Sequence, residues 1–149
     1  MDKPNITWFV KRDDSYIPLE EFHFGEYVFG DKMVIEMQIW NNRWSLTDVQ
    51  DLEMPGIVIY FDTIEDSKLL EMCSIEVEGA PLDLYIENNQ ARAMLFTDEG
   101  RKIMGQSNNG LPTENPYNFV DITFKFSAGD KRLKNNDLKN LYFELVSMN

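Results

Sequence analysis

Apolar and polar residues alternate with a period of two along nearly the whole chain. In the run 33–39, alternate residues from Met33 to Ile39 are apolar, whereas the other side carries Glu36 and Gln38. Each such run predicts a strand with one face in a core and one facing water or a partner. With shorter candidates included, the pattern predicts about nine strands. These are residues 6–11, 22–29, 33–39, 57–62, 69–77, 82–87, 91–96, 120–126 and 141–146.

Turn residues separate these strands, and helical patterns are short. Glu78-Gly79-Ala80-Pro81 and Glu87-Asn88-Asn89-Gln90 stand at hairpin positions. Ser45–Leu52 predicts two helical turns and Asn136–Asn140 one. Neither segment is long enough for the crossover that joins parallel strands. We therefore predict an all-β fold, an antiparallel β-sandwich of the jelly-roll or immunoglobulin-like kind, in one domain spanning 1–149.

One segment, 98–118, interrupts the alternation with three glycines and two prolines. An irregular connection of about 20 residues is uncommon in a compact domain and often carries function. Two hypotheses follow. The loop contacts a ligand or a neighbouring subunit, with Asn108 and Asn109 as candidate contacts, or it is only a solvated connection.

Charge narrows the range of partners. The 149 residues carry 26 Asp and Glu against 14 Lys and Arg, a net charge of −12. A nucleic-acid partner is not expected, because binding phosphates requires clustered cations. The acidity is uneven: residues 1–100 have a net charge of −14 and residues 101–149 of +2. The split suggests head-to-tail contact between copies that weakens with added salt, although a solubilising acidic surface explains it more simply.

The chain is poor in side chains for catalysis. It has one cysteine and one histidine, and no Gly-x-Ser-x-Gly or phosphate-binding glycine motif. Cys73 lies in phase with apolar neighbours, which predicts a buried thiol. His23 alternates with two phenylalanines, which places it on the outer side of its strand. We predict no catalytic residues, no metal site, no cofactor and no enzymatic activity.

Carboxylates leave two weaker hypotheses. Acidic turns can bind calcium through loop oxygens, and two clusters occur. The clusters are Asp48, Asp51, Glu53 and Asp62, Glu65, Asp66. A pair of carboxylates in a cleft could also serve a small hydrolase, but the sequence singles out no such pair.

Aromatic residues on nominally outer strand faces are the best candidate contacts. Trp40 is in phase with the polar side of its run, and Trp44 follows beside Asn42 and Arg43. Tyr60, Tyr85 and Tyr142 also fall on outer sides. Exposed rings of this kind anchor protein interfaces or stack on sugars. This surface is therefore predicted to be covered by another subunit or by the long loop of the same chain.

Together these features favour a non-enzymatic structural or assembly protein that docks to itself or to a larger particle. In fold class and composition the chain resembles the small sandwich proteins that decorate or join parts of tailed-phage particles, which implies a virion component. The alternative is a carbohydrate-binding module that uses surface aromatics. The N-terminus, Met1-Asp2-Lys3-Pro4, lacks the pattern of a signal peptide, and no window is apolar enough to span a membrane. We therefore expect synthesis in the cytoplasm and no membrane insertion.

Overall fold

The computed structural model describes residues 1–19, 22–24, 32–61, 64–96, 100–127 and 139–147. Within them strands are the main secondary structure, and there is one 3₁₀ helix, η1. The strands are β1 (Ile6–Arg12), β2 (Ser15–Pro18), β3 (Phe22–Phe24), β4 (Lys32–Asn41), β5 (Leu52–Glu53), β6 (Pro55–Phe61), β7 (Cys73–Val77), β8 (Ala80–Pro81), β9 (Tyr85–Glu87), β10 (Gln90–Met94), β11 (Lys102–Ile103), β12 (Phe119–Ser127) and β13 (Lys139–Ser147), and η1 is Ile64–Met72.

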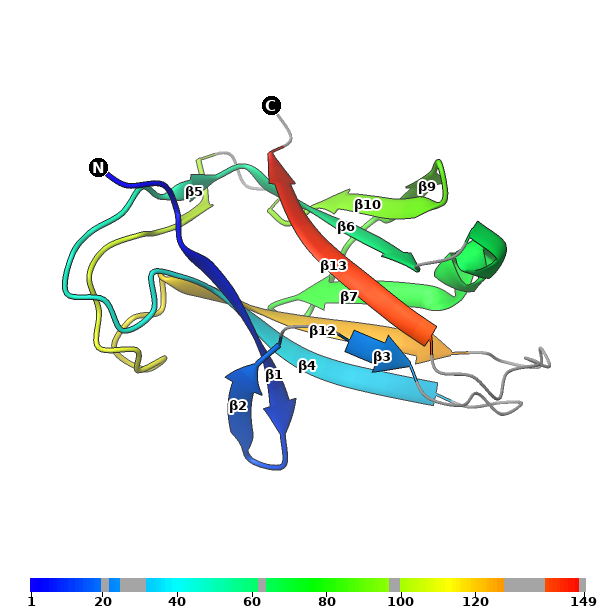
Figure 1. The fold of residues 1–149 in the computed structure, drawn as a ribbon, viewed down its shortest axis with the longest axis horizontal. Helices are drawn as coiled ribbons and strands as arrows, with labels where there is room; N and C mark the ends of the chain where they lie inside the picture. Colours follow the sequence, from blue (N-terminus) through cyan, green and yellow to red (C-terminus); the bar gives the residue numbers. More distant parts are fainter. Residues whose placement is uncertain (20–21, 25–31, 62–63, 97–99, 128–138, 148–149) are drawn as a thin grey trace.

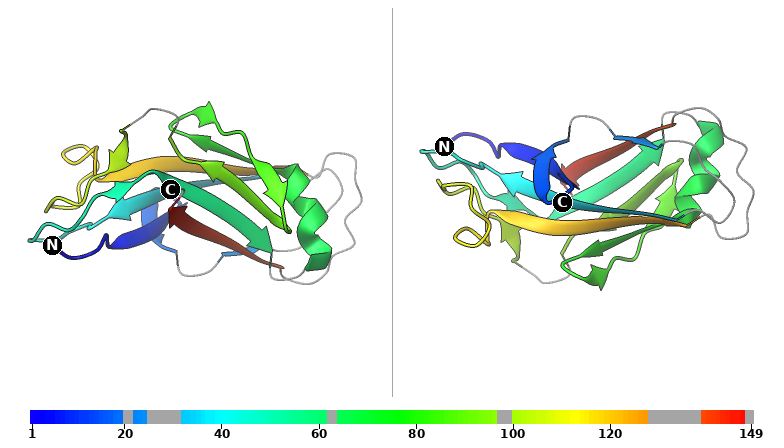
Figure 2. Two further views of the ribbon diagram at one scale, coloured as in Figure 1. Left: turned by 90° about the horizontal axis from the view of Figure 1, so that it is seen from above. Right: turned by 90° about the horizontal axis from the view of Figure 1, so that it is seen from below.

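Eleven of these strands form two packed sheets, which confirms the predicted antiparallel sandwich, and β5 and β11 pair separately. The six-stranded sheet has the order β2-β1-β4-β12-β7-β8, and the five-stranded sheet has the order β3-β13-β6-β10-β9. All named strands pair antiparallel with their neighbours. Figure 1 shows β4 and β12 side by side, with β13 running obliquely to them, and Figure 2 shows the molecule from above and below.

The apolar sides of the predicted strands meet between the sheets. Met37, Ile39 and Ile59 are fully buried there, as the alternation predicts. The ring of Phe143 in β13 lies 5.4 Å from that of Phe124 in β12 and 5.7 Å from that of Trp8 in β1, measured between centroids. A ring from one sheet thus packs against rings from two strands of the other, and this contact fixes the relative position of the layers.

The two hairpin turns are correctly predicted. Glu78 and Gly79 connect β7 to β8 with positive φ angles of 51° and 85°. Asn88 and Asn89 connect β9 to β10 with φ angles of 51° and 61°. Both are two-residue loops of the kind that matches the twist of the strands. Asn and Gly tolerate this backbone region well, whereas Glu78 adopts it at some cost.

The predicted helix at Ser45–Leu52 is wrong. Its backbone groups bond outside the segment, since the Val49 N–H donates to the Gly105 carbonyl and the Thr47 carbonyl accepts from the Asn42 side chain. Contacts with the long loop therefore replace the local ladder of a helix. For Asn136–Asn140, residues 136–138 lie outside the described residues, and Lys139 and Asn140 belong to β13.

Three predicted strands are shorter than expected, and one of these, 91–96, ends at Met94. In 69–77, residues 69–72 belong to η1 and only 73–77 form a strand. Leu69 and Leu70 are both buried although they are adjacent, which a helical turn permits and a two-sided strand does not. In 82–87, only 85–87 form a strand. Of the predicted strand 22–29, residues 22–24 form β3 and the others lie outside the described residues.

The one helix that the structure describes, η1, is too short and too polar to cross a membrane.

Candidate functional site

Two irregular segments, 41–51 and 104–118, lie together at one end of the sandwich. We call this pair the loop end. It occupies the end of the molecule opposite η1, beside the N-terminus (Figure 1). Much of the segment predicted as an irregular loop is ordered by its bonds to 41–51. Within the predicted loop 98–118, Lys102 and Ile103 form β11, which pairs with β5, and residues 98–99 lie outside the described residues.

Buried asparagines hold the loop end together. Asn41 is fully buried, and its side-chain NH₂ donates to the carbonyls of Gln50 and Ile103, at 2.9 and 3.2 Å. Its side-chain oxygen accepts from the Asn5 N–H at 2.9 Å. Asn118 is also fully buried and donates to the carbonyls of Met104 and Gln106, each at 2.9 Å. Each amide therefore satisfies backbone groups that no sheet or helix pairs.

A second pair of asparagines joins the two segments directly. Asn42 donates to the carbonyls of Thr47 and Gly105 at 2.7 and 2.9 Å. Asn108 donates to the carbonyl of Asn42 at 2.8 Å and accepts from the backbone N–H groups of Trp44 and Gly110. The structure thus gives Asn108 a role in building the loop end. Asn109 is exposed and bonds to Glu114 and Asn115 within its own segment.

The first acidic cluster also serves the loop backbone. Asp48 accepts from the Ser107 N–H and Asp51 from the Gly105 N–H, both at 2.8 Å. The Gly105 N–H, and then Lys102 at 2.9 Å, lower the pKa of Asp51 below its ordinary value. Among the described residues no group of three or more His, Cys, Asp or Glu is placed to hold a metal ion. Asp62 of the second cluster lies outside them.

Arg43 lies in an aromatic cage at the base of the loop end. Its guanidinium carbon is 4.4, 4.5 and 4.0 Å from the ring centroids of Phe9, Trp40 and Trp44. Its Nε and Nη2 donate to the Gly110 carbonyl, while the buried Nη1 has no hydrogen-bond partner among the described residues. Burial lowers the pKa of Arg43 from its ordinary value. Ring faces compensate part of this burial, because their negative quadrupoles attract the cation.

The prediction that Trp40 is exposed is wrong. Its phase is as predicted, but its exposed fraction is 0% because the loop end covers that part of the outer sheet face. Its ring stacks on Phe119 at 4.6 Å between centroids. Its Nε1 donates to Gln38, and Gln38 in turn donates to Asp121, each at 3.0 Å. The ring and the cation that contact the Trp40 ring, Phe119 of β12 and Arg43 of the segment 41–51, belong to the same chain.

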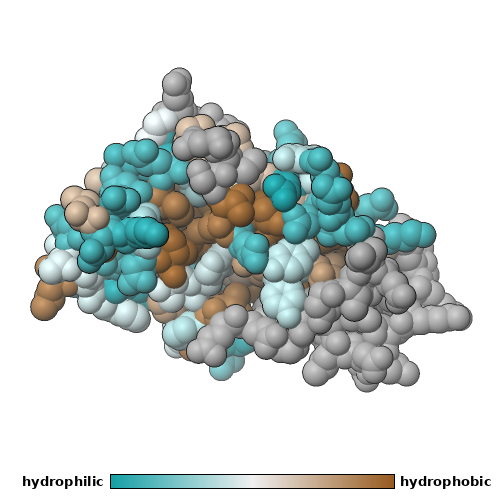
Figure 3. All heavy atoms as spheres, turned by 45° about the horizontal axis from the view of Figure 1, so that its top comes forward, coloured by the Kyte–Doolittle hydropathy of each residue, from teal (hydrophilic) through white to brown (hydrophobic). Residues whose placement is uncertain are grey.

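Four large apolar side chains project from this ordered frame into solvent. Trp44 is 61% exposed and Leu46 is 97% exposed, while Leu111 and Tyr117 are also exposed. We call these four the docking surface. The space-filling view shows apolar atoms at this end of the molecule (Figure 3). Since Arg43 lies over the ring of Trp44, one face of that indole is already occupied.

The predicted tyrosines lie away from the loop end. Tyr60 and Tyr142 face each other on β6 and β13, with ring centroids 5.2 Å apart. The hydroxyl of Tyr60 donates to Glu144 at 2.7 Å, which raises the pKa of Tyr60 to about 12. Tyr85 is exposed on β9, at the edge of the same sheet. The structure therefore divides the predicted contact residues between two surfaces.

The Cys73 thiol lies on the inner side of β7 and donates to the Leu69 carbonyl at 3.4 Å. Cys73 is half-buried as a residue, and desolvation of the thiol by burial raises its pKa to about 12. The thiol therefore remains protonated and is a poor nucleophile near neutral pH. β3 places the backbone of His23 opposite Asn140, but the predicted orientation of its side chain lies outside the described residues.

Cations of the slightly basic C-terminal region pair with acidic side chains of residues 1–100. The pairs are Arg101 with Glu78, Lys102 with Asp51 and Lys125 with Glu76. Four further cations lie at positions 131, 132, 134 and 139, whose side chains are not among the described residues. Part of the charge difference that suggested head-to-tail contact is thus neutralised within the chain.

Comparison with protein-family models, with curated proteins and with solved structures finds no match for this chain.

Proposed function

We propose that this protein is a non-enzymatic assembly module that docks by its loop end onto a neighbouring subunit, in the first place a second copy of the chain. A larger particle such as a virion is the natural setting for such a module. The observation that carries the proposal is the docking surface itself: Trp44 and Leu46 are exposed on a backbone that buried asparagines hold in place. Anchors held in this way lose little conformational freedom on binding.

The electrostatics suggest that docking is driven by apolar contact. Two copies, each with a net charge of −12, repel each other at a distance. Because at least three cations of the C-terminal region are already paired within the chain, they contribute little attraction between copies. We therefore expect added salt to strengthen association by screening the repulsion, in contrast to the weakening expected from charge pairing.

A carbohydrate-binding module, the alternative, has less support. Sugar stacking requires an open ring face, but Trp40 is buried and one face of Trp44 carries the Arg43 guanidinium. Tyr60 and Tyr142 stack on each other.

The test compares self-association of the wild type with that of a Trp44→Ser, Leu46→Ser double variant by sedimentation equilibrium. We expect the wild type to form concentration-dependent oligomers and the double variant to remain monomeric. Tyr85→Ser, which removes an exposed ring from β9, is the matched control and should associate like the wild type. A wild type that is monomeric at all concentrations, or a double variant that associates equally well, would overturn the proposal.

A further inference from the structure

A groove opens at the edge of the sandwich, where the β7–β8 hairpin approaches the segment that follows β10. It consists of two adjoining cavities of about 220 and 390 Å³, which share Glu78, Phe96 and Arg101. We call it the edge groove. Its combined size falls in the range of small-molecule pockets.

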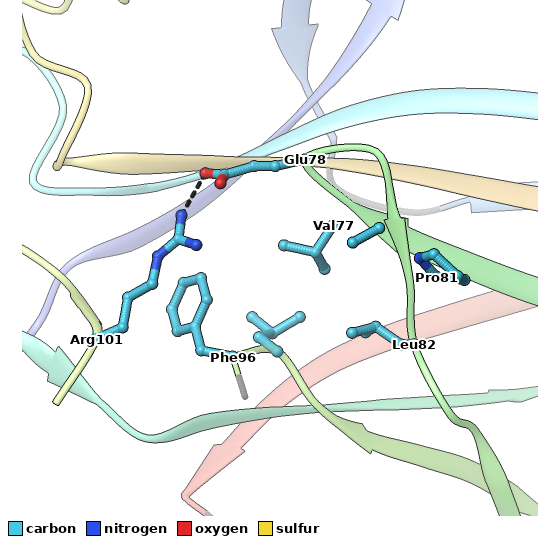
Figure 4. Close-up of a pocket in the computed structure, with 8 residues that line it drawn as sticks. Val77, Glu78, Pro81, Leu82, Phe96 and Arg101 are labelled. Atoms are coloured by element: carbon cyan, nitrogen blue, oxygen red, sulfur yellow. Dashed lines mark hydrogen bonds and ion pairs between the residues drawn. The ribbon is translucent and has the colours of Figure 1, made fainter. Parts of the chain in front are cut away.

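Most of the residues that line the first cavity are apolar. Val77, Leu82 and Leu95 line it, together with Ala80 and Pro81 of β8. Figure 4 shows these side chains around an open space, with Glu78 and Arg101 bonded to each other at one side. An apolar chain that enters this space would therefore have a charged pair beside its head.

Arg101 makes one more side-chain contact than Glu78 does. Arg101 Nη2 lies 2.5 Å from Glu78 Oε1, and both side chains are 39% exposed, so the ion pair itself contributes little stability. The Arg101 guanidinium also lies 4.4 Å from the centroid of the Phe96 ring. Glu78 has a φ of 51°, a region that favours glycine and asparagine. Displacing Glu78 breaks one ion pair, whereas displacing Arg101 also breaks a cation–π contact.

The second cavity adds a further cation. Lys102 lines it beside Tyr117 and Phe119, so the charged side chains among the described lining residues are two cations and one carboxylate. Lys102 is paired with Asp51, which is not among these lining residues. Cations therefore outnumber carboxylates among the described lining residues, in a chain whose net charge is −12.

We propose that the edge groove binds a small carboxylate with an apolar tail. The tail occupies the first cavity, and the carboxylate pairs with Arg101 in place of Glu78. An apolar amine fits less well, because it would pair with Glu78 and release Arg101 from both of its contacts. Planar pairing of a guanidinium with a carboxylate supplies the head-group selectivity.

The test titrates the protein with octanoate, octanol and octylamine in a calorimeter, since these probes share a chain and differ in head group. We expect octanoate to bind at one site, and more tightly than either of the others by about tenfold or more, the effect of one charge-assisted pair. Equal binding of octylamine, or no binding of octanoate, would overturn the proposal.

Three test variants, two of them with a matched control, locate the binding site in the edge groove. Arg101→Met should remove the preference for octanoate over octanol, while Arg12→Met, which removes an exposed cation elsewhere, should leave it unchanged. Glu78→Asn should tighten octanoate binding, because it frees Arg101 and suits the turn, whereas Glu87→Asn makes the same charge change outside the groove. Leu82→Trp should fill the first cavity and abolish binding. Melting curves will show that each variant is folded, and an unchanged octanoate affinity in Arg101→Met would contradict the assignment.

This inference goes beyond the proposed docking. Tyr117 belongs to both the docking surface and the edge groove, so the two proposals are separated by changing residues that belong to only one of them. The Trp44→Ser, Leu46→Ser double variant changes no residue that lines the edge groove. We therefore expect it to bind octanoate like the wild type even if it no longer associates.

Discussion

The loop end and the core between the two sheets are both well packed, but different forces order these two regions. In the core, side chains such as Ile39 and Phe124 are buried by non-directional apolar contact. In the loop end, Asn41, Asn42 and Asn118 are equally buried and bond to specific backbone groups. Apolar packing tolerates small changes of shape, whereas a buried hydrogen-bonding group cannot be replaced without leaving its partners unpaired.

The largest effect should come from Asn41→Leu. The change removes the partner of the buried Ile103 carbonyl and of the part-buried Asn5 N–H and Gln50 carbonyl. A buried unpaired group costs about 1–3 kcal/mol, and the two part-buried groups add to this loss. We expect a loss of about 3 kcal/mol or more in the free energy of unfolding, measured with denaturant. Ile39→Val, in the same strand, is the core control and should cost only about 1 kcal/mol. Equal losses would show that the two regions do not differ as we infer.

A smaller effect should follow from Gly105→Ala. A Cβ there would lie 2.4 and 2.5 Å from the carbonyl oxygens of Val49 and Gln50, so the loop backbone must shift. We expect a loss of about 1–3 kcal/mol, as for other overpacked sites. Gly100→Ala is the control, since Gly100 has a positive φ but open space around it, and it should cost about 1 kcal/mol. If Gly105→Ala cost no more than Gly100→Ala, the close approach would not be the cause.

The smallest effect concerns Asp121 of β12. Its carboxylate accepts a hydrogen bond from the Gln38 side chain, which itself accepts one from Trp40. Partial burial, and then the carboxylates of Glu78 and Glu36, raise the pKa of Asp121, although the bond from Gln38 opposes them. A raised pKa in the folded state means that stability is full below the unfolded pKa of 3.8 and falls as the pH rises through the folded value. Asp121→Asn should therefore raise stability at neutral pH by less than about 1 kcal/mol, because solvent screens the exposed face.

Stability curves measured at several pH values test this expectation, since the gain should vanish below the unfolded pKa. A variant that is less stable than the wild type at neutral pH would show that the charge-assisted bond from Gln38 outweighs the burial and the neighbouring carboxylates.

The candidate site could be predicted only in part. The sequence singled out Trp44 and Asn108 as candidate contacts, because an indole among polar residues and an Asn-rich segment stand out. The structure places both in the loop end, and their contact with a partner stays a prediction. It placed Trp40 on the correct side of its strand but could not show that another segment covers that side. Asn41, Asn42, Asn118 and Arg43 were not recognised as the frame of the site. The abundance of Asn around residues 41–42 and 108–118 was the available signal, but Asn is as common in solvated turns.

The sequence by itself determined the all-β class, the inner faces of the longest strands and the two-residue hairpins, because these depend on local alternation and turn chemistry. The tertiary structure decided which outer positions are buried, where the C-terminal cations find partners and how 41–51 and 104–118 combine. The physical reason is the distance along the chain: Asn42 bonds to Gly105 across 63 positions, and Arg101 pairs with Glu78 across 23. No periodicity within one segment records such contacts, and the docking surface and the edge groove both depend on them.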